Sequence, residues 1–184
     1  MNHDAPALAW HYDERLREVP DDRAAFEAAL DTRVDEIATA RSQPARLLAM
    51  LLEATPLLRI AGRAEEARRT ASAAIALAEL VEDPLAEYAG QLALAELMRQ
   101  EGRYEISTPL FDQLVARARS MPMHDASLHD ALFAAGRNLF EQAHYAQAAR
   151  HLRECQALRR SAAHDDLLEV TASALRLCNE RLRR

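Results

Sequence analysis

The stretch Gly136–Leu152, with the sequence GRNLFEQAHYAQAARHL, decides the fold. A short segment, Ala143-His144-Tyr145, divides it into two halves, and small residues lie on both sides, at Gly136 and Ala148. Apolar residues in both halves recur at spacings of three and four, which is the period of an amphipathic helix. The stretch therefore predicts two helices that approach each other closely across a tight turn.

Similar turn segments occur earlier in the chain, at Gly62-Arg63-Ala64 and at Gly102-Arg103-Tyr104. The spacings are 102 − 62 = 40 and 143 − 102 = 41 residues, and a weaker copy, Asp22-Arg23-Ala24, lies 40 residues before the first. A small residue at such a turn lets the chain leave a helix in a left-handed conformation, which Gly tolerates best. A period near forty with a helix on each side of the turn predicts a helical solenoid.

Three sets of positions around the turns fit this interpretation. Close contacts between paired helices need small residues, and a position between repeats can take a larger one. The small residues seven positions before the turns are Thr55, Ala95 and Gly136. The small residues five positions after the turns are Ala67, Ser107 and Ala148. The position between repeats, nine after the turns, has Ala71, Phe111 and Leu152.

The same patterns predict nine helices, over residues 5–18, 22–41, 45–60, 64–82, 85–100, 105–120, 125–141, 145–160 and 165–182. Pro84, Pro109 and Pro122 fall at or near their boundaries, where a missing amide costs least, whereas Pro56 should kink the third helix. Asp83 and the pair Asp165-Asp166 are predicted to be N-terminal caps.

Composition supports an all-α chain. Hydrophobic residues make up 49% of the 184 residues and aromatic residues only 5%, so the core is mainly Ala and Leu and sheet structure is not expected. A net charge of −6 disfavours nucleic acid as a partner. The longest purely apolar run, Leu47–Leu52, is too short to cross a membrane. With two cysteines and no secretory signal, we expect a cytoplasmic protein.

The pattern resembles the tetratricopeptide repeat family, through the small contact residues above and through Tyr104 and Tyr145 beside two of the turns. The resemblance covers about residues 44–163, although the family's usual period is about 34 residues. The longer period is similar to that of kinesin light chains and of helical-repeat regions in bacterial transcription activators. HEAT-like repeats, which also have the right length, remain an alternative.

The resemblance implies one right-handed α-solenoid domain over residues 1–184. Its parts would be a degenerate hairpin at 1–42, repeats at about 44–83, 84–123 and 124–163, and a capping helix at 164–184 with Arg176, Arg181, Arg183 and Arg184 on its exposed side. It also implies a concave groove that holds a peptide or helix of another protein.

Carried over to this sequence, the groove residues come mainly from the second and third repeats. The expected binding residues are Leu92, Glu96, Arg99, Phe133, Arg137 and Phe140, flanked by Leu52, Arg59, Asp130, Ala174 and Arg181. Apolar residues beside Arg could grip a segment that carries carboxylates, with the guanidinium groups binding them bidentately. Alternatively, Phe140 and Leu92 are ordinary interhelical core, and Arg59 or Arg99 is only solvated.

The chain has seven histidines, which are candidate metal ligands. His124 and His129 flank acidic residues, and His151 lies four residues before Cys155, but zinc needs three or four converging ligands. We expect no metal, no cofactor and no catalytic residues. The leading hypothesis is a protein-interaction module; the alternatives are a secretion-type chaperone and a helical metal-dependent enzyme. Opposite charge at the two ends of the chain also favours a homodimer slightly.

Overall fold

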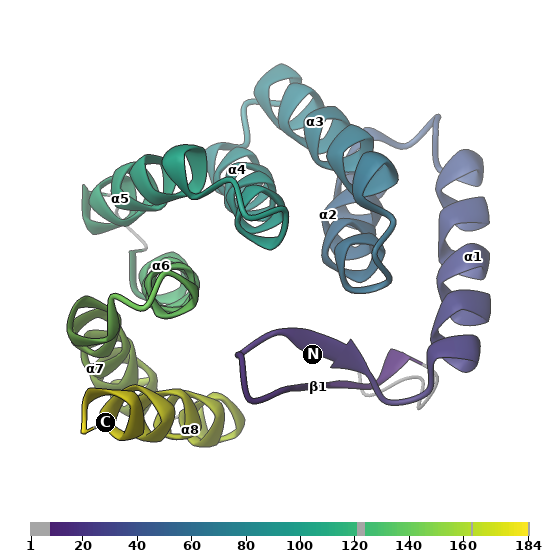
Figure 1. The fold of residues 1–184 in the computed structure, drawn as a ribbon. Helices are drawn as coiled ribbons and strands as arrows, with labels where there is room; N and C mark the ends of the chain where they lie inside the picture. Colours follow the sequence, from purple (N-terminus) through teal and green to yellow (C-terminus); the bar gives the residue numbers. More distant parts are fainter. Residues whose placement is uncertain (1–7, 121–123, 163, 184) are drawn as a thin grey trace. The chain divides into compact units, whose positions relative to one another are not determined.

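The computed structural model is all-α, with eight consecutive helices after one small β-hairpin (Figure 1). It describes residues 8–120, 124–162 and 164–183. The helices are α1 (Arg23–Thr39), α2 (Pro44–Ile60), α3 (Ala64–Leu80), α4 (Pro84–Gln100), α5 (Tyr104–Ser120), α6 (His124–Glu141), α7 (Tyr145–Ser161) and α8 (Asp165–Leu182). All eight begin within one residue of a predicted start and end within two residues of a predicted end.

The predicted first helix, over residues 5–18, is wrong where the structure describes it. Strands β1 (Trp10–Tyr12) and β2 (Glu18–Pro20) pair there as an antiparallel hairpin, with Trp10 opposite Pro20. The turn is closed by Asp13, whose backbone N–H donates to the Arg17 carbonyl and whose carboxylate accepts from the Arg17 N–H, both at 2.9 Å. The expectation that the chain contains no sheet is therefore also wrong.

The left-handed conformation predicted for the turns between paired helices is confirmed. The backbone φ angle is +82° at Gly62, +73° at Gly102 and +61° at Ala143. After each of these residues the next N–H donates back to a carbonyl of the preceding helix, as His144 N does to Leu139 O at 2.9 Å. Such bonds satisfy carbonyls that a helix end would otherwise leave exposed.

The weaker copy of the turn, at residues 22–24, differs from the other three. Asp22 follows a strand, has a φ of −127°, and caps α1 with its side chain, which accepts from Ala25 N. Glu82, which the pattern did not single out, has a positive φ of +57° between α3 and α4. Asp83 next to it is the predicted cap, since its carboxylate accepts from Leu85 N and Ala86 N at 3.1 and 2.9 Å.

One proline, Pro109, and one predicted cap differ from expectation. Pro109 lies inside α5 and not at its boundary, and α2 continues to Ile60 through Pro56. The residue that precedes α8 is His164, and its side chain makes no capping hydrogen bond. Asp165 begins the helix itself. Pro122 lies outside the described residues.

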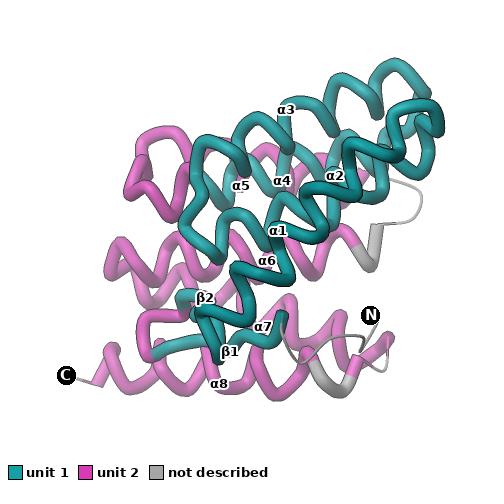
Figure 2. The backbone as a smooth tube through the Cα atoms, turned by 90° about the vertical axis from the view of Figure 1, so that its right-hand side faces the viewer, with its two compact units in different colours: residues 1–13, 17–97 teal, residues 14–16, 98–184 magenta. Residues whose placement is uncertain are grey.

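The chain divides into two compact units (Figure 2). The first unit comprises Met1–Asp13 and Arg17–Leu97, and the second comprises Glu14–Leu16 and Met98–Arg184. The division falls inside α4, and it assigns the tip of the hairpin turn to the second unit.

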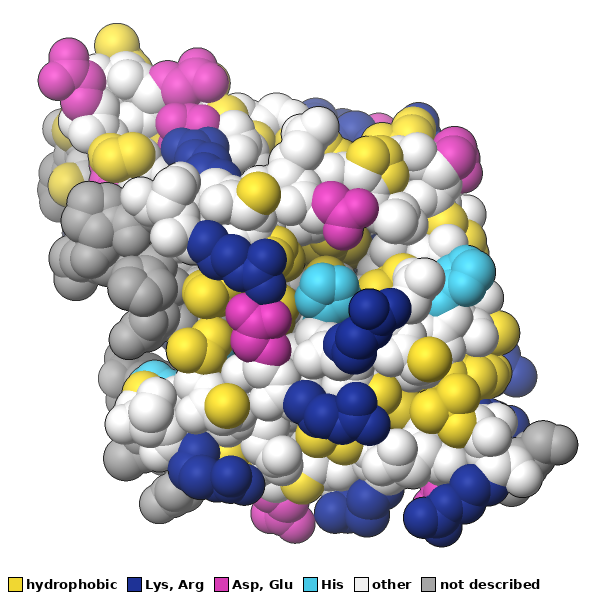
Figure 3. All heavy atoms as spheres, turned by 90° about the vertical axis from the view of Figure 1, so that its left-hand side faces the viewer, with side chains coloured by type: hydrophobic (Ala, Val, Ile, Leu, Met, Phe, Trp, Pro, Cys, Tyr) yellow, Lys and Arg dark blue, Asp and Glu magenta, His cyan; other side chains and the backbone are white. Residues whose placement is uncertain are grey.

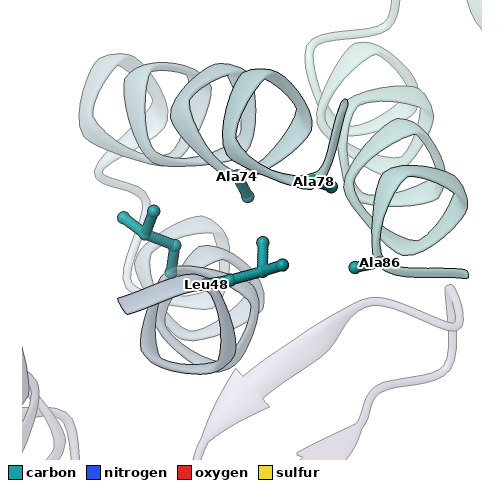
Figure 4. Packing of buried hydrophobic residues seen from close by; sticks show 5 residues of the cluster. Leu48, Ala74, Ala78 and Ala86 are labelled. Carbon is teal, nitrogen blue, oxygen red and sulfur yellow. The ribbon is translucent and has the colours of Figure 1, made fainter. Parts of the chain in front are cut away.

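In the first unit, alanines allow the helices to pack closely. Leu48 and Leu51 of α2 form a cluster with Ala74 and Ala78 of α3 and with Ala86 of α4 (Figure 4). A glycine makes a second close approach: a Cβ atom built on Gly90 of α4 would lie 2.7 Å from Cγ1 of Ile75 in α3. The low aromatic content of the chain is thus explained by small residues at helix contacts.

In the second unit, α6 packs against both α5 and α7. Gly136 is the close contact with α7 that the sequence predicted, because a Cβ atom there would lie 2.8 Å from Cγ of Leu152. On the side of α5, Ser107 hydrogen-bonds Asn138 at 2.6 Å, and the Asn138 amide donates to Thr108 at 2.9 Å. Both predicted small positions, Gly136 and Ser107, therefore lie at helix–helix contacts.

Helix α8 packs mainly on α7. Thr171, Ala174 and Cys178, spaced by three and four residues, are fully buried on one face of α8. Arg176, Arg181 and Arg183 are exposed, as expected for the outer face of a terminal helix. Arg184 lies outside the described residues.

Candidate functional site

The six predicted binding residues are mostly buried. Their exposed fractions are 8% for Glu96, 1% for Arg99, 5% for Phe133, 2% for Arg137 and 6% for Phe140, while Leu92 is partly buried. Leu92 and Glu96 belong to the first unit, and the other four belong to the second. The arginines are not the solvated side chains of the alternative hypothesis, so their contacts decide what they do.

Arg99 is bound to a carboxylate of its own chain. Its Nη1 lies 2.5 Å from Oε1 of Glu141, and the hydroxyl of Tyr104 donates to the other oxygen of Glu141 at 3.0 Å. The side chains of Arg99 and Glu141 are only 1% and 4% exposed. Because a buried ion pair is costly to break, Arg99 stabilises the contact between the end of α4 and α6, and Tyr104 joins α5 to the same carboxylate.

Arg137 binds a backbone carbonyl from a distant part of the sequence. Its Nε donates to the carbonyl oxygen of Leu16 at 3.0 Å, across 121 residues of sequence and within the second unit. Leu16 is 2% exposed. The guanidinium carbon of Arg137 also lies 5.7 Å from the ring centre of Phe133, one turn earlier on α6. The two predicted residues therefore lie together beside a segment of backbone.

A third arginine, Arg159 of α7, completes this group, and sequence reasoning missed it. Its guanidinium lies 4.6 Å from the ring centre of Phe133, and it donates to Thr171 Oγ1 at 2.7 Å and to Asp130 at 3.3 Å. The signal was present: buried residues of α7 recur at Ala148, Leu152, Cys155 and Arg159, so Arg159 continues the apolar face. We call Phe133, Arg137 and Arg159 the α6 site.

The first unit contains a related arginine, Arg59, in α2. Its guanidinium donates to both carboxylate oxygens of Glu18 in β2, at 2.8 and 3.0 Å, and the two side chains are 7% and 5% exposed. Arg59 and Arg99 both stand three residues before a turn glycine. In these two hairpins, the position three residues before the turn therefore places a buried guanidinium on a carboxylate of the same chain.

The histidine and cysteine pairs were the basis for a metal hypothesis. Within residues 8–120, 124–162 and 164–183, no group of three or more His, Cys, Asp or Glu side chains could hold a metal ion. Burial raises the pKa of Cys155 to about 11, and its thiol donates to the His129 carbonyl at 3.2 Å. Burial also lowers the pKa of His151. The side chain of His124 lies outside the described residues.

Exposed side chains are mixed in type. On the face shown in Figure 3, arginine side chains lie among hydrophobic ones, and every basic side chain there is Arg because the sequence contains no Lys. In the part of the chain that the structure describes, no helix is both long and apolar enough to span a bilayer.

No protein-family model matches the sequence, and no curated protein matches it either. The assignment of a role to this fold therefore depends on the geometry of the α6 site and of the repeated turns.

Proposed function

We propose that the chain is a protein-binding module of the tetratricopeptide-like, long-helix kind, and that it holds a segment of another protein on α6. In this proposal α2–α3, α4–α5 and α6–α7 are the three repeats of a right-handed solenoid, and α8 is its cap. Hairpins of this type cannot bury their apolar faces alone, so they stack and leave an extended surface for binding.

The repeated turns support the solenoid. The three turn residues Gly62, Gly102 and Ala143 share a positive φ and a spacing of 40 and 41 residues. The small contact positions around them are buried in all three hairpins, including Thr55, Ala95 and Gly136 before the turns. A regular unit with a regular turn is what stacking requires.

The observation that carries the binding role is the hydrogen bond between Arg137 and the Leu16 carbonyl. It lies on the helix, and at the residue, where the resemblance to the repeat family implies a bound peptide. In this structure a peptide segment of the same chain is held there. Because Arg137 binds the backbone carbonyl of Leu16 here, it can also bind the backbone carbonyl of a partner segment that has a similar conformation.

The chemistry of the proposed contact differs from the original expectation. Arg99 already has a carboxylate partner in Glu141, so we no longer assign it to a partner's acidic residue. Arg137 binds a carbonyl, and Phe133 beside it supplies an aromatic surface. We therefore propose that binding depends on backbone and apolar contacts more than on charge.

Site-specific photo-cross-linking tests the proposal from a half-exposed position on α6. Asp130 is on α6, has a side chain that is 55% exposed, and contacts Arg159, so a photoreactive amino acid placed there samples the α6 site. Gln147 is an exposed residue of α7 and is the matched control. Each protein is incubated with lysate of the source organism, irradiated, and analysed by mass spectrometry.

The expected result is one partner that is cross-linked from position 130 and not from position 147. Cross-linking only from position 147, or from neither position, would contradict the assignment of the binding site to α6.

A further inference from the structure

We propose, resting on the function proposed above, that the α6 site accepts a tight turn of the partner that presents one large aliphatic side chain. In the free chain, the turn Glu14–Leu16 occupies that site in the partner's place. The site would then be regulated by exchange between the chain's own turn and the turn of the partner.

The turn Glu14–Leu16 is buried at one residue only. Glu14, Arg15 and Arg17 are exposed, whereas Leu16 between them is 2% exposed. Residues 14–16 belong to the second unit, with α6, although the residues on both sides of them belong to the first unit. Within Glu14–Leu16, Leu16 is therefore the buried residue, and its carbonyl is bound by Arg137 of the second unit.

The backbone of Leu16 adopts an uncommon conformation. Leu16 has a φ of +60°, a left-handed conformation that is unfavourable for a residue with a branched side chain. Strained conformations of this kind persist where surrounding contacts determine them, and they concentrate at binding sites. The residue that Arg137 holds is left-handed, so the occupant seen at the site is a turn and not an extended strand or a helix.

The groups that meet at the α6 site limit what it can recognise. The Leu16 carbonyl accepts from Arg137, and every amino acid carries such a carbonyl, so this bond fixes position without fixing sequence. Arg159 already donates to Thr171 and Asp130, and both arginines lie against the Phe133 ring. The group that distinguishes one partner from another is therefore the aliphatic side chain, and an acidic peptide is not the preferred ligand.

Occupation by the chain's own turn should weaken binding of any competitor. A tethered segment is present at high effective concentration, and the apparent affinity for an added ligand falls with the fraction of sites that are open. Removing the Leu16 side chain should therefore open the site to a copy of the turn that is added in solution.

The test is a fluorescence anisotropy titration with a labelled cyclic peptide that copies Trp10–Pro20. These two end residues are opposite each other in the hairpin, so joining them keeps the turn closed. The peptide is titrated with full-length wild type and with Leu16→Asn, because Asn tolerates the left-handed conformation better than other polar residues. Leu16→Gly, which also tolerates it, is a second variant in case the first is poorly folded.

Leu182→Asn is the matched control protein. Leu182 is 50% exposed on α8 and stands in the same local sequence, Glu-Arg-Leu-Arg, as Leu16. We expect the peptide to bind Leu16→Asn or Leu16→Gly about tenfold more tightly than it binds wild type and Leu182→Asn. The same peptide with Asn in place of its leucine should bind none of the four proteins.

Equal affinity for wild type and the two Leu16 variants would overturn the inference, and so would the absence of binding to all of them. Neither result would remove the proposed function, which the cross-linking from position 130 tests separately with the natural partner. If cross-linking fails but the peptide binds Leu16→Asn tightly, the α6 site binds the chain's own turn and does not bind another protein.

Discussion

Replacement of Gly136 tests the close contact between α6 and α7. A Cβ atom on Gly136 would lie 2.8 Å from Cγ and 3.0 Å from Cδ2 of Leu152, and 3.5 Å from the Ala148 carbonyl. Favourable contacts between carbon atoms lie at about 3.5–4.0 Å, so Leu152 would have to move by several tenths of an ångström. Leu152 is 0% exposed, so a shift of this size would press it against other core residues.

The magnitude follows from two opposing terms. Gly136→Ala gains about 1 kcal/mol because Ala is the better helix former. Overpacking a tight core costs about 1–3 kcal/mol, so the net change for Ala is a loss of about 0–2 kcal/mol. Gly136→Leu inserts three more carbon atoms into the same contact, so its loss should reach at least the upper part of the overpacking range, about 3 kcal/mol.

Free energies of unfolding from urea titrations of the single and double variants provide the assay. Gln147→Leu, at an exposed position of α7, is the control for adding a leucine and should change stability by less than about 0.5 kcal/mol. The double variant combines Gly136→Ala with Leu152→Ala. The smaller residue at position 152 should make room for the new methyl group at position 136, so the two substitutions should show a favourable coupling free energy of about 0.5–3 kcal/mol. Equal losses for Gly136→Leu and Gln147→Leu, or strict additivity in the double variant, would refute the contact.

Four further predictions follow from single residues. Ala143→Gly should stabilise the chain by about 0.5–1 kcal/mol in urea titrations, since Ala143 holds a φ of +61° that Gly adopts without strain; a loss of stability would contradict this. Arg99→Met should cost about 3–5 kcal/mol in the same assay because it removes the charged partner of the buried Glu141 carboxylate, and a loss below about 1 kcal/mol would show that the pair is open to water. Burial lowers the pKa of His151, so the unfolded state takes up the proton first and the free energy of unfolding should fall as pH decreases below about 6.5. His151→Gln should reduce the slope of unfolding free energy against pH, and an unchanged slope would show that His151 does not cause this pH dependence. Because burial raises the pKa of Cys155 and of Cys178 to about 11, both thiols should react with a disulfide reagent at pH 8 only after unfolding, and rapid labelling of the native protein would be the opposite result.

The helices were predictable from sequence because their signals are local. Apolar spacing, the turn residues Gly62, Gly102 and Ala143, and the cap at Asp83 each act within one or two turns of helix. Physical rules for helix ends therefore located eight helices to within two residues.

The β-hairpin was not predictable by the same reasoning. Residues 5–18 contain Ala, Leu, Glu and Arg, which are good helix formers, and no Asn-Gly or Asp-Gly turn marks the reversal. The contact that holds β2 is the ion pair of Glu18 with Arg59, 41 residues away, and a local pattern cannot show it. A tertiary contact thus overrode local propensity.

The candidate site was predictable in part. Helical spacing placed Phe133 and Arg137 on one face of α6, and the structure has them in contact. Spacing could not say that Arg99 would find its carboxylate in Glu141, or that Arg137 would bind the carbonyl of Leu16. Both partners are remote in sequence, so only the folded chain reveals them.

Hydrogen–deuterium exchange with and without the cross-linked partner tests the central claim, that α6 holds a partner segment at the place now taken by the chain's own turn. We expect slower exchange over α6, His124–Glu141, and faster exchange over the turn Glu14–Leu16 in the complex, because the partner's turn replaces that of the chain. Leu182, exposed at the end of α8, lies in a segment that should exchange equally in both samples. Unchanged exchange in both α6 and the turn, with protection elsewhere in the chain, would contradict the account.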